Sequence, residues 1–226
     1  MDLGVEDVNS TPHPGWISVF RQLMKLRVIV LLQVTAICAI LVHDLVTELE
    51  RTWLDTGYTI LITVVGGTLS AGGSNAINMW YDADIDPLMR RTKNRPVPQG
   101  HITANGALLF GVIIALLGSS LFFLVSWKAA FWSFFSVVFY VLIYSIWLKR
   151  RSPQNIVIGG IAGSTPPLIG WAAAAGDSVL ESINPLALGS PIPWLFFALI
   201  FFWTPPHFWA LALYRSGEYA KAQVPM

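Results

Sequence analysis

Long apolar stretches dominate the chain, and six of them are long enough to cross a membrane. A transmembrane helix needs about 20 predominantly apolar residues to cross a hydrocarbon core of roughly 30 Å. Membrane β-strands would instead alternate over segments of about ten residues, whereas the apolar runs here are continuous. The pattern therefore predicts an all-α, polytopic transmembrane helical bundle with spans at residues 26–46, 57–80, 105–126, 129–148, 155–175 and 193–213.

The composition agrees with an integral membrane protein. Apolar residues make up 54% of the 226 residues and charged residues only 12%, whereas soluble domains carry about 25% charged residues. A net charge of +1 is too small to indicate a nucleic-acid-binding protein. The single cysteine, Cys38, lies inside an apolar stretch without a second cysteine to pair with, so it gives no information about redox compartment.

Residue size separates the spans into two groups. The second and fifth spans are rich in glycine, serine and alanine, which allow helix backbones to approach closely, and we expect these two inside the bundle. The third and fourth spans carry large apolar side chains and are expected to face lipid more. The residues behind the second expectation are Leu108, Leu109, Phe122, Phe123, Phe134 and Phe135.

Basic residues predict how the spans are oriented. Twelve of the fourteen lie before or at the very start of the first span, after the second, after the fourth or after the sixth, and only Arg51 and Lys128 fall in the opposite loops. Cytoplasmic loops are enriched in Lys and Arg, so both termini are expected inside. Residues 1–20 lack an apolar core and are partly acidic, which argues against a signal or transit peptide. We expect a cytosolic segment at 1–25, a transmembrane domain at 26–226 and a prokaryotic plasma membrane location.

An acidic pattern ends the second span. Asn78, Asp82 and Asp86 are spaced i, i+4 and i+8, so on a helix each is displaced by only about 40° from the previous one. Pro87 disfavours helix for the residue before it, so the helix should end near there. Two carboxylates would then lie at the negative end of the helix dipole, which is electrostatically unfavourable. A bound cation would resolve this conflict, and oxygen ligands of this kind suit Mg²⁺.

A basic run follows the acidic pattern directly. Arg90, Arg91, Lys93 and Arg95 can bind oxyanions. Carboxylates, a divalent metal and a nearby basic cluster are the parts needed to bind and ionise a diphosphate ester. The alternative interpretation is a solvated loop whose basic residues only determine topology. A cation or metabolite transporter is a second alternative, although transporters place such sites nearer the membrane midplane.

Three stretches resemble a known family: NMWYDADIDPLMRRTKNRP at 78–96, YSIWLKRRSPQNIVIGG at 144–160 and TPPHFWALA at 204–212. Together they resemble the intramembrane aromatic prenyltransferase superfamily, and within it the heme-farnesylating branch. The resemblance implies transfer of farnesyl from farnesyl diphosphate to a vinyl group of heme B, giving heme O. Heme A synthase is then an expected downstream partner, and a quinone-precursor prenyltransferase is the nearest rival within the enzyme class.

The resemblance also implies roles for particular residues. Those expected to hold Mg²⁺ and act in catalysis are Asn78, Asp82, Asp86 and Glu218. Those expected to bind diphosphate are Arg91, Lys93, Arg95, Lys149 and Arg150. Lys149 and Arg150 are also explained by topology anchoring alone, and Gln154 and Asn155 by helix capping in preference to substrate binding.

His207 follows two prolines inside the sixth span. An intramembrane ionisable residue is a functional hypothesis by default. A neutral imidazole could ligate heme iron or orient the porphyrin, and the alternative is a histidine bonded to a neighbouring helix.

The sequence departs from the resembled family in two respects. Family members usually have about nine spans, whereas six are predicted here. The second acidic motif of the family, normally starting with Asp-Tyr, is represented by Glu218 and Tyr219, and it runs only to Met226. These departures predict that the 226 residues alone bind Mg²⁺ weakly and show little activity, and that a longer chain restores it.

Overall fold

The computed structural model describes residues 15–47, 51–179, 183–214, 217, 220 and 224–225. Within these residues the fold is entirely helical and contains no strand. The α-helices are α1 (Trp16–Met24), α2 (Leu26–Val46), α3 (Trp53–Tyr81), α4 (Ala104–Leu121), α5 (Trp127–Val138), α6 (Asn155–Ser164), α7 (Pro166–Ala175) and α8 (Ile192–Tyr214). Short 3₁₀ turns lie at η1 (Asp86–Leu88), η2 (Phe122–Leu124) and η4 (Gly176–Val179), and η3 (Phe139–Leu148) is a π-helix.

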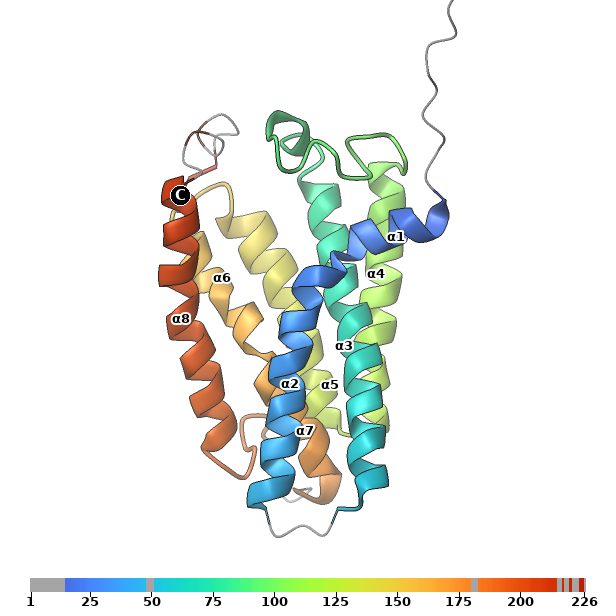
Figure 1. Ribbon diagram of the computed structural model, residues 1–226, viewed down its shortest axis with the longest axis vertical. Coiled ribbons are helices and arrows are strands. Elements are labelled where there is room, and N and C mark those ends of the chain that lie inside the picture. Colours follow the sequence, from blue (N-terminus) through green and yellow to red (C-terminus); the bar gives the residue numbers. More distant parts are fainter. Residues whose placement is uncertain are drawn as a thin grey trace, which may run out of the picture.

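Six membrane spans are confirmed by the helices. They cover Leu26–Val46, Trp53–Tyr81, Ala104–Leu124, Trp127–Leu148, Asn155–Ala175 and Ile192–Tyr214. The spans run up and down the bundle, and α1, the loop 82–103, the start of α6 and the end of α8 all lie at one end (Figure 1). This arrangement agrees with the distribution of basic residues, and we call this the proximal end and the opposite one the distal end.

The second and fifth spans lie inside the bundle, as their small residues predict. Their most apolar windows are 56% and 67% buried, against 12–33% for the other spans. A Cβ atom at Gly73 would lie 2.4 Å from the Gly111 carbonyl oxygen, and one at Gly118 would lie 2.4 Å from the Ser70 nitrogen. Only glycine permits such close backbone contact, so these positions bring α3 and α4 together.

The expectation for the third and fourth spans is wrong at Phe122. Leu109 and Phe123 are exposed, as expected, but Phe122 is fully buried. The chain leaves the α-helix at Leu121, and the Phe122 ring enters the space that Gly66 leaves on α3. The space beside Gly66 on α3 is thus filled by the large ring of Phe122 from the next span. The residue pattern of a single helix does not reveal such packing.

Helix α1 lies across the bundle instead of spanning it. Val19 and Leu23 pack against α3 and α4, whereas Trp16 and Ile17 are exposed. Figure 1 shows α1 crossing α3 and α4 near the proximal end. Lys25 makes the bend into α2 with left-handed backbone angles, φ 54° and ψ 51°, a conformation that costs a non-glycine residue about 1 kcal/mol or more.

Two spans depart from regular α-helix at depth in the bundle. The fifth is broken between α6 and α7 at Thr165, directly before Pro166 and Pro167. The Ala162 carbonyl near the break accepts hydrogen bonds from Thr165 Oγ1 at 2.8 Å and Ser136 Oγ at 3.2 Å. Side chains thus satisfy a backbone group near the break, as an apolar environment requires. The fourth span passes from α5 into the π-helix η3.

Candidate active site

The predicted acidic residues surround the end of α3, although not on one continuous helix. Asn78 lies in the last turn of α3, Asp82 follows that helix, and Asp86 begins the 3₁₀ turn η1. The helix therefore ends earlier than Pro87 alone would require. Arg150 Nη2 donates to the Tyr81 carbonyl at 2.7 Å, a cationic cap of the kind that helix C-termini favour. The Asp86 nitrogen still donates to the Asp82 carbonyl at 2.8 Å, so the two carboxylates stay one turn apart.

Two cations pair with these two buried carboxylates. Asp82 and Asp86 are both 0% exposed. Arg95 Nη1 lies 2.7 Å from each Asp86 carboxylate oxygen and 4.0 Å from Asp82 Oδ2. Lys149 Nζ forms an ion pair with Asp82 Oδ2. Residues from three separate segments of the chain thus form one compact cluster of alternating charge.

One oxygen of this cluster has no hydrogen-bond partner among the described residues. Asp82 Oδ1 is buried and unpaired, and such a group costs free energy unless something binds it. A hard cation is a suitable partner, and together with Asp86 and the Asn78 amide oxygen the donor set fits Mg²⁺. Among the described residues no group of three or more His, Cys, Asp or Glu side chains gathers, so the remaining ligands would come from elsewhere, for example substrate phosphates.

Burial shifts the pKa values of the surrounding groups. It raises the pKa of the Asp86 carboxyl, and the charge of Arg95 opposes that shift. It lowers the pKa of Lys149, against the raising effect of Asp82. Burial, followed by the charges of Arg95 and Lys149, lowers the pKa of Lys25 to about 7. Lys25 therefore belongs to the same electrostatic cluster, although its sequence position indicated only membrane orientation.

The loop after Asp86 is folded around a buried threonine. Thr92 is 1% exposed, and its Oγ1 donates to the Asp86 carbonyl at 2.8 Å. The Arg95 nitrogen in turn donates to the Thr92 carbonyl at 2.9 Å. These bonds hold the Arg95 side chain against Asp86. Sequence reasoning missed Thr92, because a threonine inside a basic loop carries no distinctive signal.

The π-helix positions the fourth span against the acidic residues. Asn78 Nδ2 donates to Ser145 Oγ at 3.1 Å, and Tyr81 Oη donates to the Ile146 carbonyl at 3.1 Å. Both partners lie in η3, immediately before Lys149. π-helical turns often occur at functional sites, and this one brings Lys149 to Asp82.

The remaining predicted diphosphate-binding residues lie further out. Arg150 forms a two-pronged ion pair with Asp84, at 2.7 and 2.6 Å. Its guanidinium also lies 4.5 Å from the centre of the Tyr81 ring. Arg91 and Lys93 are exposed on the loop surface. The structure thus brings Arg95 and Lys149 to the carboxylates and leaves the other three at the rim.

Two further predicted residues lie outside this cluster. His207 is exposed on α8 and stacks on Trp203, with ring centres 4.4 Å apart. Glu218 lies outside the described residues.

The described end of the chain nevertheless returns to the site. Val224 packs against Ile85 and Met89 in the loop, and the Pro225 carbonyl accepts a hydrogen bond from Asn155 Nδ2 at 3.0 Å.

That bond also corrects the expectation for Gln154 and Asn155. The helix α6 has no side-chain capping bond at its start. Asn155 is buried and donates its amide to the Ser152 and Pro225 carbonyls, while Gln154 is exposed. Asn155 therefore joins two backbone segments and does not cap the helix.

Fold and site together define a class: an integral membrane helical bundle with a buried carboxylate cluster and basic groups suited to a metal ion and phosphate. The model of the UbiA prenyltransferase family matches residues 34–226. Because the match covers most of the 226 residues, the chain belongs to this family.

Curated relatives in this family carry the name protoheme IX farnesyltransferase. The protein of Parvibaculum lavamentivorans is 46% identical over 213 residues, which cover 92% of this chain and 59% of that protein. The Bartonella tribocorum protein is 44% identical, covering 100% of this chain and 67% of its own length. The Paracoccus denitrificans protein is 53% identical over 170 residues, covering 74% and 50% respectively. The chain thus spans roughly half to two thirds of the length of these relatives.

Solved structures show the same fold. A UbiA homolog from Archaeoglobus fulgidus bound to GPP and Mg²⁺ matches with a TM-score of 0.61 and 16% identity, over 91% of this chain and 66% of that one. The same homolog bound to DMAPP and Mg²⁺ matches with a TM-score of 0.62 and 15% identity, over 92% and 67%.

Proposed function

We propose that this protein transfers the farnesyl group of farnesyl diphosphate to a vinyl group of heme B, producing heme O. The observation that carries the chemistry is the unpaired Asp82 Oδ1, buried beside Asp86, Arg95 and Lys149. The choice of heme as acceptor is supported by the relatives, which are named protoheme IX farnesyltransferase.

Asn78, Asp82 and Asp86 are the residues proposed to hold Mg²⁺, together with Glu218. When bound, the ion supplies positive charge to the diphosphate, which makes it a better leaving group. The Mg²⁺ and prenyl diphosphate of the Archaeoglobus fulgidus structures support this assignment by analogy.

The cations Arg95 and Lys149 are proposed to exchange their carboxylate partners for diphosphate oxygens. Arg95 offers a planar fork and Lys149 a point charge. In this arrangement they stabilise the charge that develops as the bond between farnesyl C1 and the diphosphate oxygen breaks, with both electrons leaving on the oxygen. Arg91, Lys93 and Arg150 are proposed to add positive charge at the rim.

The farnesyl group then acts as an allylic electrophile. The heme vinyl π-electrons form the new carbon–carbon bond, which leaves a cation on the vinyl carbon beside the ring. Water adds there and releases a proton, giving the hydroxyethylfarnesyl side chain of heme O. Water quenching does not demand a strong dedicated base.

His207 is the proposed heme contact. Its imidazole is exposed and already stacks on an aromatic ring, so a planar porphyrin could reach it from the side of α8. The proximal end is proposed to face the cytosol in a prokaryotic plasma membrane, and heme A synthase is the proposed consumer of the product.

The decisive experiment incubates the purified full-length protein with heme B, farnesyl diphosphate and Mg²⁺ and identifies the product by mass spectrometry. We expect the mass of heme B increased by one farnesyl group and one hydroxyl group, because the added water loses a proton. Transfer to a quinone precursor but not to heme would replace the acceptor. Substrate consumption in neither reaction, with cation flux into proteoliposomes instead, would replace the enzyme class by a transporter.

A further inference from the structure

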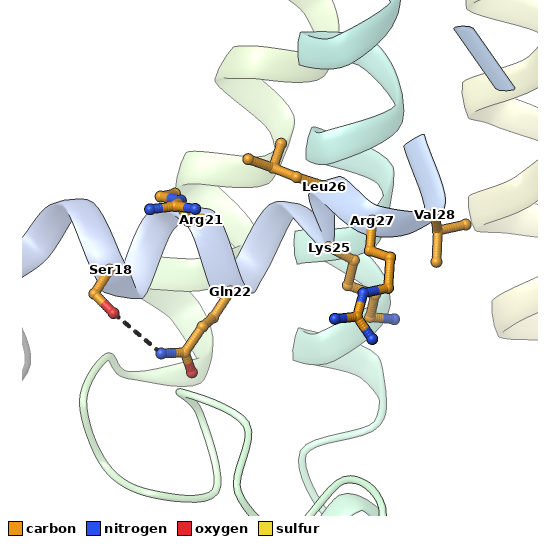
Figure 2. A pocket seen from close by; sticks show the side chains of 7 residues that line it. All are labelled: Ser18, Arg21, Gln22, Lys25, Leu26, Arg27 and Val28. Atoms are coloured by element: carbon orange, nitrogen blue, oxygen red, sulfur yellow. Dashed lines mark hydrogen bonds between the residues drawn. The ribbon is translucent and has the colours of Figure 1, made fainter. Parts of the chain in front are cut away.

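The junction of α1 and α2 forms an open pocket of about 460 Å³. Three of its lining side chains are cationic, namely Arg21, Lys25 and Arg27, and among the described residues that line it none is acidic. In Figure 2 the side chains of Lys25 and Arg27 extend in the same direction from the bend between α1 and α2, while Gln22 Nε2 donates to Ser18 Oγ at 3.2 Å. The two arginine charges, together with a basic lysine, around one hollow favour an anionic ligand.

These three cations differ from the other basic groups of the proximal end. Arg95, Lys149 and Arg150 each form an ion pair with an aspartate. In the described part of the chain, no such pair within 4 Å is formed by Arg21, Lys25 or Arg27. Arg21 and Arg27 therefore have no carboxylate partner within 4 Å in the described part of the chain, and Lys25 feels Asp82 and Asp86 only at longer range. An external anion could pair with these groups directly.

The pocket is built on a fixed bend. Asn75 Nδ2 on α3 donates to the Met24 carbonyl at 3.0 Å. A Cβ at Gly72 would lie 2.6 Å from the Met24 side chain, so α3 packs tightly against the bend. These contacts hold Lys25 in its left-handed conformation and keep the basic side chains together.

Exposed apolar side chains flank the pocket along both helices. Trp16 and Ile17 on α1 are 64% and 78% exposed, and Val28 and Leu31 on α2 are 54% and 69% exposed. An amphipathic helix that crosses the end of a membrane bundle lies at the lipid interface. Basic side chains that suit a charged head group and apolar side chains that suit an acyl chain thus lie next to each other.

We propose that this pocket binds the phosphorylated head group of an amphiphile whose apolar tail lies along the exposed sides of α1 and α2. An anionic phospholipid and an isoprenoid diphosphate share this chemistry. Lys25 lines the pocket and belongs to the charge cluster of Asp82 and Asp86, so a head group bound here is adjacent to the candidate active site. The isoprenoid source rests on the proposed function, whereas the phospholipid source does not.

Native mass spectrometry of the detergent-solubilised protein tests this site. The probes are dioleoyl phosphatidylglycerol, dioleoyl phosphatidylcholine with the same tails, and the non-hydrolysable farnesyl thiolodiphosphate. The pocket variant is Arg21→Gln with Arg27→Gln. The control is Arg151→Gln, which removes a positive charge from an exposed position outside the pocket.

The pocket variant should bind phosphatidylglycerol, farnesyl thiolodiphosphate or both about tenfold more weakly, while the control stays near wild type. Loss for one probe identifies that source, and loss for both identifies a shared site. Gln22→Trp, which fills the pocket without removing charge, should weaken the same probe and covers the case of a poorly folded double variant. Equal weakening by the control, or wild-type binding by the pocket variant and Gln22→Trp, would overturn the proposal. Phosphatidylglycerol binding is measured without turnover, so its loss is distinguishable from failure of the transfer reaction.

Discussion

Both ends of the bundle hold aspartates paired with basic side chains, but at the proximal end one described carboxylate oxygen, Asp82 Oδ1, has no hydrogen-bond partner. At the distal end Asp44 Oδ1 accepts from Arg51 Nη1 at 2.8 Å and lies 3.1 Å from His43 Nδ1. Asp44 Oδ2 accepts from Thr56 Oγ1 at 2.5 Å. Arg51 Nη2 also donates to Thr59 Oγ1. Every oxygen of this carboxylate therefore has a partner.

Similar groups thus serve different purposes at the two ends of the bundle. In the distal cluster both Asp44 oxygens are bonded to donors on α2, α3 and the loop between them, so the cluster joins these two helices and leaves no oxygen of this carboxylate without a partner. The proximal cluster has Asp82 Oδ1 free of hydrogen bonds and cations on a loop and a helix end, which can change partners. A buried carboxylate oxygen without a hydrogen-bond partner therefore distinguishes the candidate site from the distal cluster around Asp44, which has a structural role and which we call the distal clamp.

Removing the charge of Asp82 is expected to have the largest effect. Asp82→Asn keeps the shape but loses the carboxylate proposed to hold Mg²⁺, and turnover should fall at least about 100-fold. Asp86→Asn should behave similarly. Product formation by mass spectrometry at limiting Mg²⁺ is the measurement, with thermal unfolding in detergent to check folding.

Asp84→Asn is the matched control for these variants. Asp84 is exposed, and among the described residues its ion pair is with Arg150. It should leave turnover within a few-fold of wild type. Near wild-type rates in Asp82→Asn would remove the metal assignment.

Arg95→Ala tests one of the two cations of the proximal cluster. It should raise KM for farnesyl diphosphate by about tenfold, because a charge-assisted bond to an oxyanion is lost. Heme affinity should not change. Steady-state kinetics and heme titration report the two quantities, and Arg51→Ala is the distal counterpart that should leave KM unaltered. A change in heme affinity alone would place Arg95 on the heme propionates instead.

Asp44→Asn tests the distal clamp. We expect the free energy of unfolding to fall by about 2 kcal/mol, because Arg51 loses its charged partner in a partly buried place. Turnover per folded molecule should stay unchanged. Thermal unfolding in detergent measures the effect on stability, and activity measured below the unfolding transition reports the effect on turnover. Lost activity with unchanged stability would mean that the distal end also serves the reaction.

The smallest expected effect is a pH dependence from Lys25. Burial lowers its pKa in the folded protein to about 7 from the ordinary lysine value of 10.5. Between these values the unfolded chain binds more protons than the folded one, so stability rises with pH. Melting temperatures from pH 7.5 to 9.5 should increase, and Lys25→Met should flatten this increase. Lys93→Met, at an exposed position, should retain the wild-type slope.

Span number and burial could be predicted because they depend on local properties. The length and continuity of each apolar stretch determine where a helix can cross, and glycine-rich stretches such as that around Gly73 indicate close packing. The same reasoning failed at Phe122, whose burial depends on a glycine in another span.

The candidate site could be predicted only in part, for a similar reason. The spacing of Asn78, Asp82 and Asp86 is visible in the sequence and matches their proximity in the fold. The pairing of Lys149 with Asp82 and the closeness of Lys25 arise from long-range packing. Thr92 acts through one hydrogen bond of its side chain inside a loop, and no periodic pattern in the sequence indicates such a bond.

The π-helix η3 has a consequence for the phase of the fourth span. Its hydrogen bonds run i to i+5 instead of i to i+4, so the angular position of each side chain drifts away from that of the preceding α5. A helical wheel calculated for Trp127–Val138 therefore assigns the wrong faces beyond Phe139. Deleting a single residue within Phe139–Leu148 would rotate every later side chain by roughly 100° about the helix axis, and we expect this to turn Lys149 away from Asp82. The length of this segment is thus a constraint in itself, separate from the identity of any residue that it contains.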